Sequence, residues 1–186
     1  MKVLILVVFW ALSFTTAKGQ TFQVDTLLMN GQINKRINLV ILGDGYTPSQ
    51  LPQFYQDAQN LTLDIFQTSP LAEYQTYFNV FAIEVPSAES GASHPNTAND
   101  CPSPTSHPSS SVNNYFGSQF DYYGIHRLLV ATNTSAITSV LANNFPMYDH
   151  VFILVNSPYY GGSGGWLATS SLHSSASEIA LSLIHI

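Results

Sequence analysis

The sequence predicts an α/β fold, in which helices cover a β-sheet. Two short and almost wholly apolar runs, residues 36–42 and 151–155, are typical of central strands. Between them, apolar residues recur at helical spacing over residues 51–65. Strand patterns alternate with helix patterns along the whole chain, and this favours an α/β fold over an all-β fold.

The first half of the chain contains three expected strands and one expected helix. The strands cover residues 21–29, 36–42 and 77–85. The helix follows GDGYTPSQ, where Thr47 is the expected N-cap, Pro48 takes the first helical position and Gln50 completes a capping box. Its apolar stripe continues to about Thr68.

The second half begins with a segment rich in Ser, Pro, Asn and Gly, residues 86–118, and a loop of this length is usually functional or disordered. A strand is expected at 125–131. A helix is expected at 135–144, with Ile137, Val140 and Leu141 facing inward. The glycine-rich stretch at 159–165 predicts a turn that leads into an edge strand. A last helix is expected from Ser175.

Residues 1–19 have the pattern of a secretory signal peptide. Lys2 precedes an apolar run over residues 3–14, and small residues follow near Ala17. A membrane anchor is the alternative, but the run is shorter than the ~20 residues that a spanning helix needs. We therefore expect a secreted or periplasmic protein with no membrane span after cleavage.

Composition narrows the set of partners. Only 9% of the residues are charged and the net charge is −6. Outside the leader the basic residues are Lys35, Arg36 and Arg127, too few for a phosphate-binding surface, so nucleic acid is not an expected partner. Cys101 is the only cysteine, which excludes an internal disulfide and favours a passive loop thiol over a nucleophile.

Three short patterns resemble a nucleophile elbow, a phosphate-binding loop and a zinc site, but none of them meets the requirements of such a site. Residues 161–165 match G-x-S-x-G, but the strand and helix that a nucleophile elbow needs do not flank Ser163 directly, which favours a glycine turn. Residues 43–45, GDG, lack the spacing of a phosphate loop and are interpreted as a turn at a strand end. The six histidines form no H-E-x-x-H, and Asp100, Cys101 and His107 match no standard zinc spacing, so neither metal ligands nor catalytic residues are predicted.

Four stretches, taken in order, resemble the IgA-peptidase family of secreted zinc metallopeptidases. They are NLVILGDGYT (38–47), YFNVFAIEVPSAESGASHP (77–95), NNYFGSQFDYYGIHRLL (113–129) and YDHVFILVNSPYYGGSGGWLATSS (148–171). The resemblance implies a zincin-like domain with a mixed, twisted sheet, whose C-terminal half is expected to be missing here. It implies zinc as cofactor and a protein or peptide as substrate.

In that family the last helix carries H-E-x-x-H, and the glycine-rich edge strand before it is expected to pair with the substrate backbone. By this resemblance the substrate-binding residues are Gly162, Gly164, Gly165 and Trp166, and the alternative is an edge strand with a structural role only. Here the helix from Ser175 runs instead into LSLIHI, which CTGTCTCTTATACACATC would encode, and that DNA resembles a transposase end sequence of sequencing adapters. We therefore expect a peptidase part at 20–181 and a non-native tail at 182–186.

The function expected from the sequence is thus that of a fragment of a secreted, zinc-dependent endopeptidase that lacks its zinc and catalytic residues. A non-catalytic secreted binding module is the alternative. It would use the long loop and three tyrosines expected to be exposed, Tyr115, Tyr122 and Tyr123. A serine hydrolase is a third, weaker interpretation.

Overall fold

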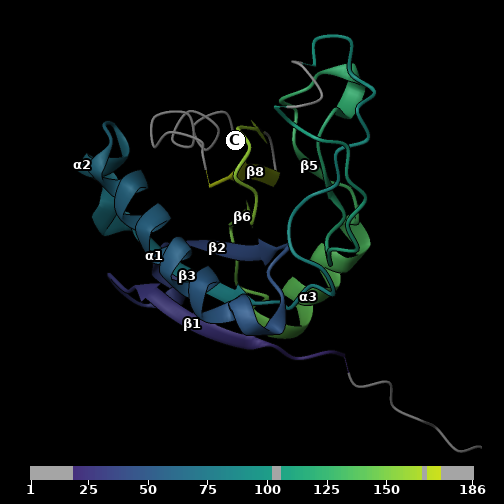
Figure 1. Ribbon diagram of the computed structural model, residues 1–186. Coiled ribbons are helices and arrows are strands. Elements are labelled where there is room, and N and C mark those ends of the chain that lie inside the picture. Colours follow the sequence, from purple (N-terminus) through teal and green to yellow (C-terminus); the bar gives the residue numbers. More distant parts are fainter. Residues whose placement is uncertain (1–18, 102–105, 165–166, 173–186) are drawn as a thin grey trace, which may run out of the picture.

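The computed structural model describes residues 19–101, 106–164 and 167–172, and Figure 1 shows their arrangement. A six-stranded mixed sheet forms the centre, with strand order β1-β3-β2-β6-β8-β7. Its strands are β1 Gln23–Leu28, β2 Ile37–Asp44, β3 Phe78–Glu84, β6 His150–Val155, β7 Gly162–Ser163 and β8 Leu167–Ser171. The four inner strands run parallel, while β1 and β7 are antiparallel at the two edges. The α/β fold expected from the sequence is confirmed.

The remaining elements lie on the two faces of the sheet and at one end of it. The α-helices are α1 Leu51–Gln67, α2 Leu71–Tyr74 and α3 Thr134–Asn144. Short 3-10 turns lie at Ile33–Lys35, Pro48–Gln50, Gln75–Tyr77 and Tyr122–Gly124. Strands β4 Ser118–Gln119 and β5 Val130–Ala131 form a separate two-stranded ribbon. Within the described ranges, no helix is long and apolar enough to cross a membrane.

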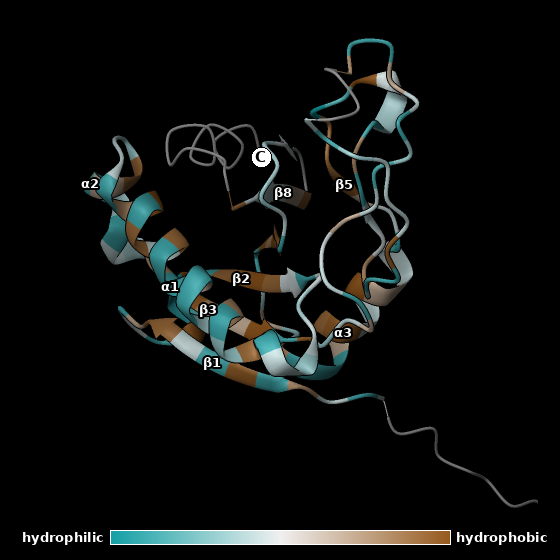
Figure 2. Ribbon diagram, viewed as in Figure 1, coloured by the Kyte–Doolittle hydropathy of each residue, from teal (hydrophilic) through white to brown (hydrophobic). Residues whose placement is uncertain are grey.

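Alternation along β2 gives the sheet two buried faces. Leu39 and Ile41 pack with Phe54 and Ala58 of α1 on one face. Val40 and Leu42 point to the other face, into a cluster that α3 and the residues after β3 complete. Figure 2 shows this pattern as brown strands at the centre and teal on the outer side of α1. Both faces are covered, which explains why β2 is apolar at nearly every position.

The start of α1 agrees with the capping pattern in the sequence. The backbone N–H of Thr47 donates to Oε1 of Gln50 at 3.0 Å. Pro48 lies in the first turn, and α1 continues from Leu51 to Gln67, one residue short of the predicted end. The helix at α3 also appears where expected, and Ile137, Val140 and Leu141 are buried.

Two predicted strands differ from the structure. Residues 125–129 were expected in a strand, but Leu128 donates its N–H to the carbonyl of Ile125 at 3.1 Å, so the chain turns there and only Val130–Ala131 is extended. Residues 167–171 were expected at the sheet edge, but β8 is buried between β6 and β7. The edge is β7 itself, so Gly162 and Ser163 belong to a strand and not to a free glycine turn. The helix expected from Ser175 lies outside the described residues.

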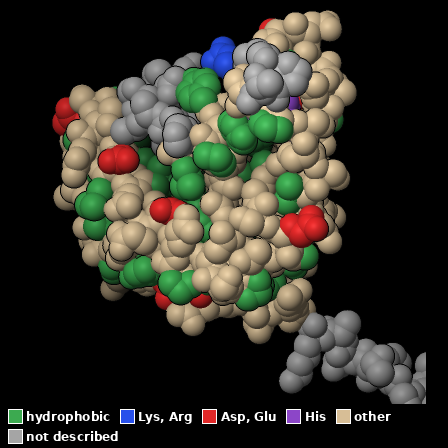
Figure 3. Space-filling view, viewed as in Figure 1, with side chains coloured by type: hydrophobic (Ala, Val, Ile, Leu, Met, Phe, Trp, Pro, Cys, Tyr) green, Lys and Arg blue, Asp and Glu red, His purple; other side chains and the backbone are tan. Residues whose placement is uncertain are grey.

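The segment between β3 and β5, residues 85–129, is called the loop region below. It contains little regular structure and, in Figure 1, projects beyond the sheet as the teal and green ribbon on the right. Charged side chains are few and widely spaced on the face shown in Figure 3, as expected for a chain with 9% charged residues. Three tyrosines of the loop region were expected to be exposed. Tyr123 is 86% exposed, as expected, but Tyr115 and Tyr122 are partly buried.

Candidate functional site

Open α/β sheets bind their ligands at the carboxyl ends of the parallel strands. β2 ends at Asp44 and β6 at Val155, opposite each other in register. The loop region packs against this end of the sheet through backbone bonds such as Gly91 N–H to Gly45 O, 3.0 Å. Two features lie here: the edge strand β7, and a group of polar side chains within the loop region.

Asp44 joins the sheet to the loop region. Its buried carboxylate accepts the backbone N–H groups of Phe116 and Ser118, each at 3.0 Å, and of Gly45 at 3.1 Å. The Ser87 hydroxyl donates to the same carboxylate at 3.2 Å. Burial raises the pKa of Asp44, and these hydrogen bonds partly offset the rise. These bonds tie the end of β2 to Ser87, Phe116 and Ser118 of the loop region, which makes Asp44 a structural anchor.

Of the GDG sequence, Gly43 and Asp44 are the last residues of β2, and the chain turns at Gly45, at the strand end where a turn was expected. Gly45 has a φ of 73°, and a Cβ built there would lie 2.2 Å from the carbonyl oxygen of Gly91. A Cβ on Gly43 would lie 2.7 Å from the ring of Phe54. The glycines therefore allow the chain to turn and the loop region and α1 to approach closely.

The edge strand β7 carries the residues that the resemblance assigns to substrate. Gly162 is partly buried and its N–H, which points away from β8, donates to the carbonyl of Arg127 at 3.1 Å. The edge is thus already covered by the loop region at Gly162, whereas Gly164 is exposed. Gly165 and Trp166 lie outside the described residues. Ser163 lies within β7, a position that differs from the strand-to-helix turn of a nucleophile elbow.

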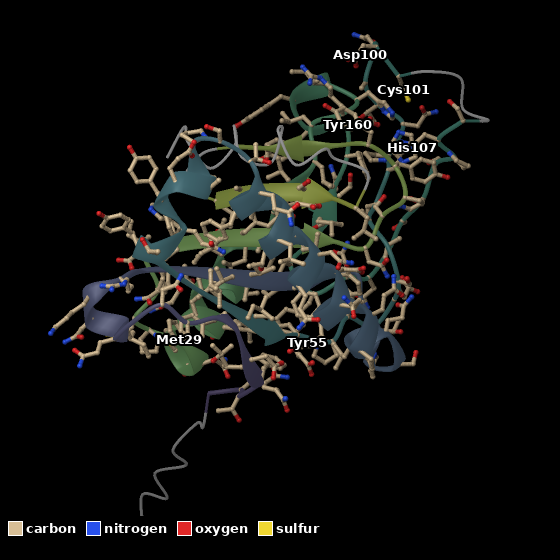
Figure 4. All side chains as sticks on the ribbon, turned by 90° about the vertical axis from the view of Figure 1, so that its left-hand side faces the viewer. Met29, Tyr55, Asp100, Cys101, His107 and Tyr160 are labelled. Atoms are coloured by element: carbon tan, nitrogen blue, oxygen red, sulfur yellow. The ribbon has the colours of Figure 1, made fainter. Side chains whose placement is uncertain are left out.

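Four side chains of the loop region converge on one point: His94, Cys101, Asp121 and His126, called the His/Cys/Asp cluster below. Their ligand atoms all lie within 4.8 Å of one another. Figure 4 shows Cys101 with Asp100 and His107 at one end of the molecule, near Tyr160 and far from Met29. The side chains of His94 and Asp121 are fully buried, and that of His126 is 13% exposed.

The distances within the His/Cys/Asp cluster are short. The Asp121 carboxylate lies 3.3 Å from Nε2 of His94 and 3.0 Å from Nδ1 of His126, through its two different oxygens. The Cys101 sulfur lies 3.5 Å from the same nitrogen of His94 and 3.2 Å from the same nitrogen of His126. Two nitrogens, a sulfur and a carboxylate oxygen are the donor types that zinc binds in proteins.

The surrounding residues hold these side chains in place. Nδ1 of His94 lies 3.0 Å from the carbonyl of Pro108, and Nε2 of His126 lies 3.2 Å from Nδ1 of His107. The backbone N–H of Thr97 donates to Asp121 at 2.8 Å. The ring of His107 is stacked between His94 and Tyr159, with centroids 3.7 and 3.8 Å apart. These contacts restrain both the rings and the carboxylate.

The ionisable groups of the cluster perturb one another. Burial, followed by the nearby His94 and His126, lowers the pKa of His107 to about 4. Burial raises the pKa of Asp121, but hydrogen bonds from His126 and Thr97 and the two histidine charges outweigh it, so the net shift is downward. Partial burial and the negative charges of Asp121 and Asp100 raise the pKa of the Cys101 thiol. The carboxylates thus make the surroundings of the sulfur favourable for a cation.

The sequence did not reveal this group. No metal ligands were predicted, because the spacing from His94 through Cys101 and Asp121 to His126 matches no standard motif. Cys101 was interpreted as a passive loop thiol, but the structure places it against two imidazoles. The available signal was the number of His, Cys and Asp residues within one long loop.

The described residues therefore form an α/β domain with a mixed sheet, a short antiparallel edge strand and a polar cluster beside it. The chain belongs to the IgA peptidase M64 family, which matches residues 26–186. This confirms the family resemblance read from the sequence, and the chain is accordingly related to peptidases. No curated protein matches the chain.

Proposed function

We propose that this chain is the N-terminal part of a secreted or periplasmic, zinc-dependent endopeptidase that hydrolyses peptide bonds of protein substrates. The observation that carries the proposal is the family match over residues 26–186. The sheet supports it, because a mixed sheet with a short antiparallel edge strand suits a zincin-like domain that binds an extended substrate at that edge.

The zinc ion of the peptidase reaction has no ligand set of its own in this chain. The sequence contains no H-E-x-x-H. The His/Cys/Asp cluster offers four protein ligands and leaves no position for water, which a catalytic zinc site needs. By the family resemblance, the H-E-x-x-H motif belongs on the helix expected from Ser175, and we propose that the native gene encodes it after about Leu181. Such a zinc ion would activate water for attack on a peptide carbonyl.

This chain's own contribution to substrate binding is the edge of the sheet. Because Gly162 already bonds to Arg127, we propose that a bound peptide pairs with the chain from Gly164 onward. The variant Gly164→Pro removes one backbone donor and is expected to raise KM about tenfold in the complete enzyme. Its zinc content should remain unchanged, which separates a substrate contact from a structural role.

The deciding experiment is to sequence the source DNA across the codons for Glu178 to Ile186 and to express the protein that it encodes. If His-Glu and a second histidine follow, we expect proteolysis that a chelator abolishes, zinc restores and a serine-directed inhibitor leaves intact. If LSLIHI is native and the complete protein cleaves no protein substrate, the peptidase proposal fails. The exposed Tyr123 and its neighbours would then be tested as a binding surface.

A further inference from the structure

The His/Cys/Asp cluster is buried, polar and built from residues far apart in the loop region, so its purpose needs a physical explanation. A catalytic Cys-His-Asp triad is one possibility. A triad base uses one ring nitrogen for the nucleophile and the other for the acid. Here each histidine directs a single nitrogen at both the sulfur and the carboxylate. Such an arrangement cannot relay a proton from Cys101 to Asp121.

With both rings neutral, the nitrogens of His94 and His126 that face Cys101 and Asp121 do not carry enough hydrogens to satisfy these two neighbours. Nδ1 of His94 faces the Pro108 carbonyl, which can only accept, so this nitrogen carries the hydrogen. In the neutral ring Nε2 then presents a lone pair to the Asp121 carboxylate 3.3 Å away. The single thiol hydrogen of Cys101 can serve only one of the two histidines. A cation between the four atoms would satisfy all of them at once.

The spacing of the four atoms fits a tetrahedral ion. With Zn–N, Zn–O and Zn–S bonds of roughly 2.0 to 2.3 Å, neighbouring ligands of a tetrahedral zinc lie about 3.3 to 3.6 Å apart. Four of the separations between these side chains are 3.0, 3.2, 3.3 and 3.5 Å, with the two histidines facing different oxygens of Asp121, and the other pairs of ligand atoms lie within 4.8 Å of each other. An ion can therefore enter with side-chain shifts of at most about 1 Å.

Charge and hydrogen bonding agree with zinc. A thiolate and a carboxylate together balance the two charges of Zn²⁺, so the filled and largely buried site would be neutral. The ring nitrogen of His94 that points away from the cluster bonds to the Pro108 carbonyl. That of His126 bonds to His107. Histidines that ligate metals are held in this way by a second hydrogen bond.

We propose that His94, Cys101, Asp121 and His126 bind one zinc ion that holds the loop region together. All four positions are filled by protein, so the ion is structural and takes no part in hydrolysis. It joins residues 94–101 to the turn at 121–126, two stretches with few regular backbone bonds. This inference does not depend on the proposed peptidase activity.

The first test measures metal in the 186-residue chain, which contains no H-E-x-x-H that could bind a second zinc ion. The protein is purified under reducing conditions without a metal-affinity step, supplied with zinc and dialysed. We expect about one zinc per chain by mass spectrometry of the metal. The variant Cys101→Ala should lose most of it, while His150→Ala, outside the cluster, should retain it. Absence of zinc from the folded wild type would overturn the proposal.

A second set of measurements avoids the risk that a ligand variant fails to fold. Cobalt added to the wild type should give intense visible bands of tetrahedral geometry and a thiolate charge-transfer band, which Cys101→Ser should lose. The variant His107→Ala keeps all four ligands and should weaken zinc binding about tenfold without changing the stoichiometry at saturation.

The thiol itself provides a third measurement. In the wild type, alkylation of Cys101 should be slow with zinc bound and become fast after a chelator removes it, since Cys101 is the only cysteine. Equal rates with and without zinc, or a cobalt complex without a thiolate band, would show that Cys101 is not a ligand and would contradict the proposed site.

Discussion

The central sheet and the loop region lie side by side, and their buried residues differ in kind. Those of β2 and β6 are mainly aliphatic or aromatic, as in Ile41, Leu42, Phe152 and Ile153. The loop region also buries polar residues, namely Ser87, His94, His107, Ser118 and Asp121. Its polar atoms bond mostly to side chains and irregular backbone, whereas those of the sheet bond along regular ladders.

This difference implies two ways of losing stability. In the sheet, a lost side chain costs roughly its buried apolar area and the cavity that it leaves. In the loop region, removal of one hydrogen-bonding side chain leaves its buried polar partner unsatisfied. The loss of stability then depends on that hydrogen bond and not on the buried area. Substitutions in the sheet should therefore change stability according to the size of the side chain. Substitutions in the loop region should change it according to the hydrogen bonds that are lost.

Truncation in the sheet should have the largest effect. Phe152 in β6 is fully buried against the α1 face. Phe152→Ala should lower the free energy of unfolding by about 4 kcal/mol, measured by urea denaturation. Leu63→Ala on α1 is the control, since Leu63 is 56% exposed and should lose less than about 1 kcal/mol. Similar losses in the two variants would contradict the role given to burial.

The turn between the two regions should be the next most sensitive position. Gly45 and Gly124 both have a φ of 73°, but a Cβ on Gly45 would meet the Gly91 carbonyl and one on Gly124 would meet nothing within 4 Å. Gly45→Ala should therefore cost about 3 kcal/mol and Gly124→Ala about 1 kcal/mol, because only the first adds a clash to the backbone strain. Equal losses in thermal denaturation would mean that the close approach to Gly91 is unimportant.

The sheet was predictable because its pattern is local. The apolar runs at 36–42 and 151–155 and the helical stripe at 51–65 each report their burial within one element, and all three lie where expected. The edge was misjudged because the glycine-rich stretch was expected to be a turn, whereas Gly162 and Ser163 form β7 and pair with Ser170 and Thr169 of β8. Strand order is set by tertiary contacts that periodicity does not record.

The His/Cys/Asp cluster was not predictable for the same reason. His94 and His126 are brought together by a turn in which Asp121 has a φ of 62° and by bonds such as Thr97 N–H to Asp121. Neither feature leaves a repeating pattern in the sequence. The family resemblance instead predicts substrate contacts at the glycine-rich strand, where the N–H of Gly162 is bonded to Arg127 within the chain.

The anchor between the regions provides the third prediction. Asp44→Asn keeps the size of the side chain but replaces one acceptor oxygen by an NH₂ group that faces a backbone donor. The variant should lose about 2 kcal/mol of stability. Hydrogen exchange should rise first at residues 85–118, where the donors Phe116 and Ser118 lie, before it rises in the sheet.

The control for this variant is Asp64→Asn, an exposed position on α1 where no measurable change is expected. Uniform loss of protection across the sheet and the loop region in Asp44→Asn would mean that the two regions unfold as one unit. The two regions would then differ in the kinds of residues that they bury but not in how they lose stability.

The smallest effect is expected at the outer edge of the sheet, between β1 and β3, where stability depends on the repulsion between two carboxylates. Burial, together with the charge of Asp25 on β1, raises the pKa of Glu84 on β3. The folded state therefore binds this proton more tightly than the unfolded chain, so Glu84 favours folding at low pH, and stability falls as the pH rises through the folded pKa. Glu84→Gln removes the repulsion and should add about 0.5 kcal/mol at neutral pH.

At about pH 3, where Glu84 is protonated, the same substitution should add nothing. The matched control is Glu73→Gln on α2, which makes the same substitution at an exposed glutamate that accepts a bond from Ser69. The measurement is the urea midpoint of the wild type and of both variants at neutral pH and at about pH 3. A gain in stability for Glu84→Gln that persists at low pH would come from packing of the amide. Side-chain packing would then determine stability at the edge of the sheet as it does at the centre.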